Sequence, residues 1–264
     1  MLWNKNISYR NCINCYIILK KYVTIYLVIN LQNTITFTFH NDNNIPNNII
    51  YKINNELLNR YRDKNICDYF IDYPNILNCN INIYFLSKSN LDNYILSINS
   101  SFKDKVPKWV TGITTDDGVY LVPNINNIPE TITLILHESI HYLSKQIPIN
   151  TDSKRYNILE EALSTYISSQ MTTGKFSKIV EDLNDNNLKT ITCFLENDDN
   201  DIFAKNNGYY YSFFFMKFLK NKYYKQKIFE YIIDNQKLFS DLPKLEKEFK
   251  EFLIDQINFY TNKK

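Results

Sequence analysis

Two histidines and one glutamate have the spacing of a site that binds and uses a metal ion. Segment Thr131–Ser144 contains His137, Glu138 and His141 in the pattern His-Glu-x-x-His. Residues four positions apart on a helix lie one turn apart on the same face, so both imidazoles can bind one Zn²⁺ from one side. The Glu138 carboxylate then lies beside the ion, where it can take a proton from a metal-bound water. We therefore expect a helix that carries a catalytic zinc site.

The surrounding residues favour this interpretation over an exposed helix with two ordinary histidines. Four of the six residues before His137 are apolar (TITLIL), which predicts a buried helix, and buried imidazoles need polar partners. The chain has three histidines. The third, His40, follows a strand-like segment, and we expect it at a strand end, away from the metal.

A catalytic zinc ion takes three protein ligands and keeps one position open. No histidine follows His141, so a glutamate from a second helix is the remaining common solution. Segment Asn157–Tyr166 offers Glu160 and Glu161. Their side chains point about 100° apart on a helix, so only one of them can face the metal. An acidic pair near a helix start is also favoured by the helix dipole, without any metal.

The two segments together resemble the gluzincin metallopeptidases, the group that holds thermolysin and the zinc aminopeptidases. The run from Leu159 to Leu163 (LEEAL) is similar to the second motif of that family. This alignment implies Glu161 as the third ligand, whereas Glu160 would give the aminopeptidase spacing. The resemblance implies one Zn²⁺ per chain and hydrolysis of peptide bonds, with Glu138 as the base. The exopeptidase signature Gly-Ala-Met-Glu-Asn is absent, so an endopeptidase is expected.

The resemblance also implies a group that stabilises the oxyanion of the intermediate. Thermolysin-like members use a histidine, which this chain lacks after His141, and aminopeptidase-like members use a tyrosine. The run GYYYSFFF that begins at Gly208 resembles their tyrosine segment, in a register that implies Tyr209. Tyr210 and Tyr211 remain open, and such an aromatic run is equally typical of a core.

Thermolysin carries an aspartate four residues after its glutamate ligand, and Thr165 stands at that position here. The resemblance therefore identifies no carboxylate that would hydrogen-bond His137 and orient its ring without itself binding the metal.

These residues need elements that position them. The turn signal Asp116-Asp117-Gly118 precedes a predicted strand that contains Val119, Tyr120 and Leu121. The resemblance implies that this strand is the sheet edge along which a peptide substrate lies, and edge pairing suits a peptide of any sequence. Asn127 and Pro129 are suited to begin the zinc helix.

The rest of the chain predicts an α+β protein with a zincin-like fold. Strands are expected at 22–30, 34–40 and 81–86, with a turn at Gln32-Asn33, and helices at 49–61 and 87–97. Later helices are expected at 176–183, 187–195, 209–224, 227–235 and 243–257, the last beginning at Pro243. We divide the chain into an extension (1–21), an α/β subdomain with the zinc helix (22–145) and a helical subdomain with the third ligand (146–264).

Composition limits the other classes of function. The chain has 264 residues, 44% of them hydrophobic, and a net charge of +2 without a basic tract, so a globular protein that does not bind nucleic acid is expected.

The apolar run at 22–31 is shorter than the ~20 residues of a membrane span. Five scattered cysteines do not indicate a disulfide framework, which favours an intracellular protein. The sequence does not indicate an oligomeric state.

Two other functions agree with the same residues. One is a pseudo-peptidase that keeps zinc but has no turnover and acts as a binding or regulatory protein. The other is a zinc hydrolase of a non-peptide amide, since a site of this kind does not by itself define its substrate. A chain that keeps the motifs and binds no metal is the remaining alternative.

Overall fold

The structure is a computed structural model of the chain. It describes residues 16–20, 22–26, 35–63, 66–98, 105–169 and 176–261. The expected turn at Gln32-Asn33 lies outside these residues, as does most of the expected N-terminal extension. The described part of that extension is not irregular, because residues 16–20 form a strand.

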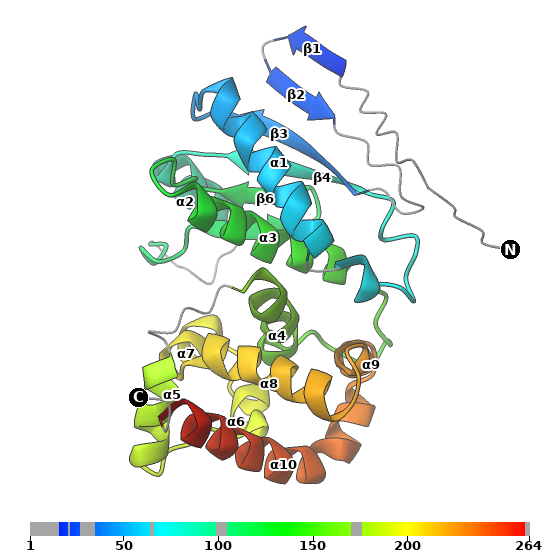
Figure 1. Ribbon diagram of the computed structural model, residues 1–264, viewed down its shortest axis with the longest axis vertical. Coiled ribbons are helices and arrows are strands. Elements are labelled where there is room, and N and C mark those ends of the chain that lie inside the picture. Colours follow the sequence, from blue (N-terminus) through cyan, green and yellow to red (C-terminus); the bar gives the residue numbers. More distant parts are fainter. Residues whose placement is uncertain are drawn as a thin grey trace, which may run out of the picture.

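A small mixed sheet organises the first part of the molecule (Figure 1). Its strands are β3 (Thr36–Asn41), β4 (Asn80–Phe85), β6 (Gly118–Leu121) and β5 (Gly112–Thr115), in that spatial order. β3, β4 and β6 run parallel, while β5 is antiparallel to β6. A separate antiparallel pair is formed by β1 (Tyr16–Lys20) and β2 (Tyr22–Tyr26).

The helices continue the order of the chain. The first part contains α1 (Asn47–Asp63), the short η1 (Ile66–Asp68), α2 (Lys88–Ile98) and α3 (Ile128–Lys145). The second part contains α4 (Asn157–Ser168), α5 (Phe176–Asn184), α6 (Ile191–Glu196), α7 (Asn200–Lys205), α8 (Gly208–Lys222), α9 (Lys227–Ile233) and α10 (Asn235–Thr261). The protein is therefore α+β, as predicted.

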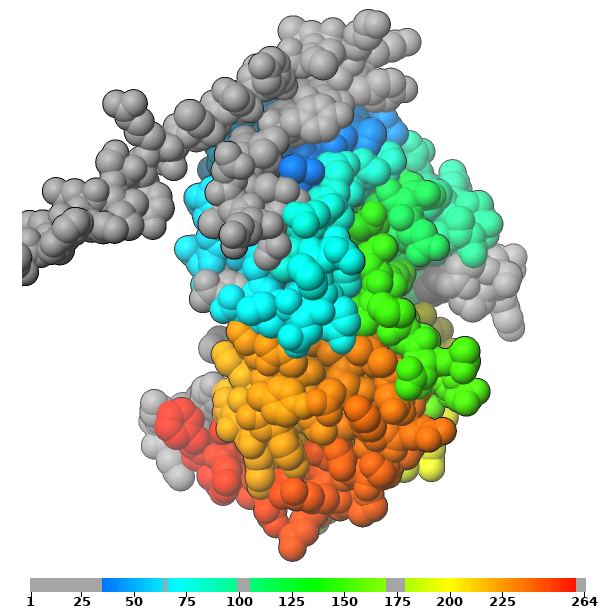
Figure 2. All heavy atoms as spheres, turned by 90° about the vertical axis from the view of Figure 1, so that its right-hand side faces the viewer, coloured from blue at the N-terminus to red at the C-terminus, as the bar shows by residue number. Residues whose placement is uncertain are grey.

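One hydrophobic core joins the two parts. Alternating residues of the strands, such as Phe37, Phe39 and Ile83, are buried on the sheet face that packs on α1 and α3. The same cluster continues through α4 to Phe215 of α8 and Phe249 of α10. Figure 2 shows the two parts in direct contact, one above the other. Helix α4, which carries Glu160 and Glu161, lies where they meet (Figure 1).

The sequence predicted the start of α3 correctly. The side chain of Asn127 caps the helix by accepting a hydrogen bond from the backbone N–H of Glu130 at 3.4 Å, and Pro129 lies in the first turn. Both features satisfy or remove the unpaired N–H groups of a helix start. A well-defined start fixes the position of every later residue on α3, including both histidines.

Two predictions about elements were wrong, and one helix was not predicted. The strand that contains Val119, Tyr120 and Leu121 is not the sheet edge, because β6 is paired on one side with β4 and on the other with β5. Helix α7 was not predicted, because only six residues form it. Pro243 does not begin a helix but lies inside α10, which starts at Asn235. Among the described helices, none is long and apolar enough to cross a membrane.

Candidate metal centre

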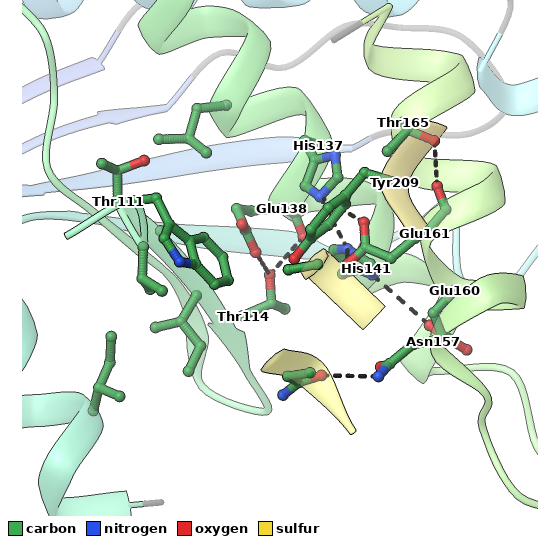
Figure 3. A pocket seen from close by; sticks show the side chains of 18 of the residues that line it. Thr111, Thr114, His137, Glu138, His141, Asn157, Glu160, Glu161, Thr165 and Tyr209 are labelled. Atoms are coloured by element: carbon green, nitrogen blue, oxygen red, sulfur yellow. Dashed lines mark hydrogen bonds and ion pairs between the residues drawn. The ribbon is translucent and has the colours of Figure 1, made fainter. Parts of the chain in front are cut away.

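The side chains of His137, His141 and Glu161 point toward one another between α3 and α4 (Figure 3). Nε2 of His137 lies 3.1 Å from Nε2 of His141. The Glu161 carboxylate lies 3.2 Å from the first of these nitrogens and 3.4 Å from the second. Four tetrahedral ligands at about 2.0 Å from a zinc ion are separated by about 3.3 Å. These three residues therefore have the spacing of ligands to a single cation, and they form a group that could hold a metal ion.

The hydrogen bonds of the cluster also fit a cation. Oε2 of Glu161 is buried and has no aligned hydrogen bond, although it lies 3.2 Å from Nε2 of His137, and Nδ1 of His137 is buried without a partner. A carboxylate oxygen that is shielded from water and receives no donor is costly. A positive ion between the three ligand atoms would remove that cost for Glu161, so the donor set fits zinc.

The cluster is strongly electronegative. Burial opposes protonation of His141, but the charge of Glu161 and a contact with Glu160 outweigh it and raise the pKa of this imidazole to about 10. Burial alone would raise the pKa of Glu161, yet the two histidines hold it well below its usual range. Opposite charges that stabilise each other in this way show a site that favours positive charge.

Glu160, the alternative ligand, points to the other side of His141. Its carboxylate accepts hydrogen bonds from Ser144 Oγ at 2.7 Å and from Arg155 Nη1 at 2.6 Å. Its Oε2 lies 3.9 Å from Nδ1 of His141, the ring nitrogen that faces away from the cluster. Glu161 and not Glu160 therefore completes the cluster, and Glu160 is placed to orient His141.

Arg155 connects the two helices behind this contact. Besides Glu160, its guanidinium donates to the carbonyl of Ile147 at 2.5 Å and, in a longer contact of 3.4 Å, to that of Lys145. Lys145 is the last residue of α3, and Glu160 lies in the first turn of α4. The polar loop between the helices is therefore held against both of them at the metal centre.

His137 has no equivalent partner. The hydroxyl of Thr165, which stands where the resemblance places an aspartate, donates to the backbone carbonyl of Glu161 one turn earlier. Nδ1 of His137 accordingly remains without a hydrogen bond. The departure from the family pattern noted in the sequence thus has a structural counterpart at one of the two imidazoles.

Glu138 lies next to the cluster but outside its ligand set. Its Oε2 accepts a hydrogen bond from the hydroxyl of Thr114 at 2.7 Å, and that hydroxyl also lies 2.8 Å from the Glu138 carbonyl. Its Oε1 faces Gly112, where an added Cβ would lie 3.2 Å from it. Both neighbours belong to β5. Sequence reasoning missed Thr114 and Gly112, because nothing local relates this strand to α3.

Of the three consecutive tyrosines, Tyr209 reaches the cluster. Its ring extends across the pocket toward His137, Glu138 and Glu161 (Figure 3). Burial, together with the charges of Glu161 and Glu138, raises the pKa of the Tyr209 phenol far above its usual value. The hydroxyl is therefore a proton-bearing donor at neutral pH. Tyr210 also lines the pocket.

Tyr211 has a structural role. It is fully buried, and its hydroxyl donates to Asp182 at 2.9 Å and accepts from the N–H of Lys189 at 3.0 Å.

The cluster lies in a pocket of about 880 Å³ between the two parts of the molecule. One wall is the edge strand β5 and the loop before it, and the facing wall comes from α4, α7 and α8. Val119, Tyr120 and Leu121 do not line this pocket, since β5 lies between them and the free edge. Gly112, Ile113 and Thr114 of β5 line the pocket in place of the three residues predicted to contact substrate.

The chain was compared with protein-family models, curated proteins and solved structures, and none of them matches it.

Proposed function

We propose that the chain is a zinc-dependent peptidase of gluzincin type with a zincin-like fold, and that it acts as an endopeptidase. The observation that carries this proposal is the cluster of His137, His141 and Glu161, whose ligand atoms, one from each residue, all lie within 4.8 Å of one another. Glu138 adjoins the cluster, which opens into a pocket with a free strand edge. Each of these features is needed for metal-assisted hydrolysis of a peptide.

Zinc held by these three residues would supply Lewis-acid activation of water and of the scissile carbonyl. Glu138 then takes the proton of the attacking water on its Oε1, because Oε2 is occupied by the Thr114 hydroxyl. The same carboxyl group returns that proton to the leaving amine. Thr114 keeps the carboxylate aimed at the pocket while this proton is moved.

Two further groups support the same reaction. The protonated phenol of Tyr209 donates a hydrogen bond to the oxygen on which negative charge develops. The edge of β5 offers backbone groups to an extended peptide. Val122 N–H bonds the Thr111 carbonyl at 2.8 Å, so in this antiparallel pair Gly112 and Thr114 direct their backbone groups away from β6. A substrate can pair with those groups whatever its side chains are.

The test combines metal content with turnover. The purified protein is expected to contain about one zinc per chain and to cleave members of a peptide library, as found by mass spectrometry. Glu138→Gln is expected to keep the zinc and lose the cleavage, since the residue is not a ligand. Zinc with no cleavage of any peptide would favour a binding protein, and turnover by Glu138→Gln would contradict the mechanism.

A further inference from the structure

The residues of α3 that line the pocket change from apolar at one end to cationic at the other. Leu134 lies one turn before Glu138, and Lys145 lies one turn after His141; all four line the pocket. At 1.5 Å per residue, the eleven positions from Leu134 to Lys145 span about 16 Å of helix. The catalytic groups therefore stand between an apolar end and a cationic end of the same pocket.

The apolar end is built around an exposed tryptophan. Trp109 leaves 53% of its surface exposed, and its ring packs edge to face on Tyr209 with centroids 6.4 Å apart. Further apolar lining residues at this end come from α2, α3, β5 and the loop before β5: Ile95, Leu134, Ile113 and Val110. A bulky apolar side chain that covers the indole removes apolar surface of both from water.

Two lysines of the pocket, one of them Lys145 at its cationic end, have no carboxylate partner among the described residues. Lys145 and Lys205 both line the pocket and are exposed, and no ion pair within the described part of the chain involves either of them. The ammonium of Lys145 donates to the outward-facing carbonyl of Thr114 at 2.7 Å. An ammonium has three N–H donors, so two remain for a ligand. The third cation of the pocket, Arg155, is already paired with Glu160.

We propose that the pocket selects an extended peptide that carries a bulky apolar side chain on one side of the reacting bond and a carboxylate on the other. The apolar group packs on Trp109, and the carboxylate pairs with Lys145. This inference rests on the proposed function, whose site it makes more specific. Val110 and Thr114 are four positions apart along the chain, at most about 13 Å when extended, so the two groups stand up to about four residues apart in the peptide.

The experiment measures binding apart from cleavage. The zinc-loaded Glu138→Gln protein is titrated calorimetrically with four peptides of one length, which carry Phe or Ala at one position and Glu or Gln four positions away. We expect Phe to bind about tenfold more tightly than Ala, as burial of a large side chain gives. Glu should bind a few times more tightly than Gln, as for an exposed ion pair, and 0.5 M salt should reduce that preference.

Variants of the pocket test which residue causes each of the two binding preferences. Trp109→Ala should remove the preference for Phe and leave that for Glu, and Lys145→Met should do the reverse. Tyr51→Ala and Lys250→Met are matched controls, because they remove an exposed aromatic and an exposed lysine outside the pocket. With Trp3 replaced by Phe, Trp109 is the remaining tryptophan, and its fluorescence should change on binding of the Phe peptides.

The results separate this inference from the proposed function. Both preferences, removed by the matching variants, support the inference whether or not the unmutated protein cleaves the peptide. Equal affinity for all four peptides, no binding of any, or preferences that the pocket variants leave unchanged would overturn it. Peptides with a free or amidated C-terminus, in place of Glu, show whether the carboxylate is a side chain or a chain end.

Discussion

The two imidazoles of the metal centre are held in different ways. His141 has a carboxylate behind it, and that carboxylate is itself fixed by Ser144 and Arg155. His137 is equally close to Glu161 but has no hydrogen bond at its outer nitrogen. A ligand held from behind loses less freedom when it binds a metal. The comparison teaches that protein contacts alone orient His141, whereas His137 has no such contact at its outer nitrogen and would gain one more constraint from a bound metal ion.

The largest loss of zinc affinity is expected for a change at Glu161, the residue that contacts both imidazoles. Glu161→Ala removes one ligand of three. If the binding free energy of zinc is divided among its ligands, the loss is roughly 3 kcal/mol, a more than hundredfold weaker affinity. Competition with a chromophoric chelator measures it. Glu196→Ala, at an exposed glutamate, is the control, and unchanged affinity in Glu161→Ala would exclude this residue as a ligand.

The next largest loss of zinc affinity is expected for a change at Glu160, which lies behind His141 alone. Glu160→Gln keeps the shape of the side chain but removes the charge behind His141. We expect zinc affinity to fall by about ten- to a hundredfold, as for other partners of metal-bound histidines. The same chelator competition measures it, together with the melting temperature of the metal-free protein. A drop in melting temperature without any loss of affinity would show that Glu160 is only structural.

A smaller loss of zinc affinity is expected for a change at Arg155, which contacts Glu160 and not the histidines. Arg155→Met removes a cation from a half-buried ion pair and leaves Glu160 with its bond from Ser144. We expect about 1–3 kcal/mol less stability, because a buried charge loses its partner, and a loss of zinc affinity below that of Glu160→Gln. Urea unfolding monitored by circular dichroism gives the first value. Replacement of the exposed Lys154, also in this loop, is the comparison.

The smallest change in zinc affinity is expected for a change at Thr114, the β5 residue that contacts Glu138. Thr114→Val removes the hydroxyl that holds the Glu138 carboxylate, which is not a ligand. Zinc affinity should stay within about twofold, while stability falls by about 1–3 kcal/mol because a buried acceptor is left without its donor. Peptide turnover, where it is present, should fall as well. A Thr114→Ser variant keeps the hydroxyl and should behave like the unmutated protein; a large loss of zinc in Thr114→Val would contradict the division of roles.

The sequence predicted the part of the site that one helix defines. His137, Glu138 and His141 lie within five residues, so helical geometry alone brings them together. The choice between Glu160 and Glu161 depends on how α4 is rotated about its axis. That rotation follows from packing, since Leu159, Ala162 and Leu163 are all fully buried, and it is not contained in the acidic pair itself.

The groups around the site could not be predicted in the same way. Thr114 contacts Glu138 across 24 residues of sequence, and β5 is only four residues long, too short for a periodic pattern. The order of strands was misjudged for the same reason: the hairpin at Asp117 places β5, and not β6, at the edge. Contacts between elements depend on the topology of the whole sheet, which no local pattern specifies.

The contact between Lys145 and the Thr114 carbonyl also bears on the solubility of the protein. An uncovered strand edge is a template on which another chain can add a strand and begin an aggregate. Here the edge is four residues long, and the ammonium of Lys145 occupies one of its outward carbonyls at 2.7 Å. A second copy that paired with this edge would have to displace that charge. A short peptide can still pair with the outward backbone groups of Gly112, which Lys145 leaves uncovered, whereas this charge discourages the growth of an intermolecular sheet along the whole edge.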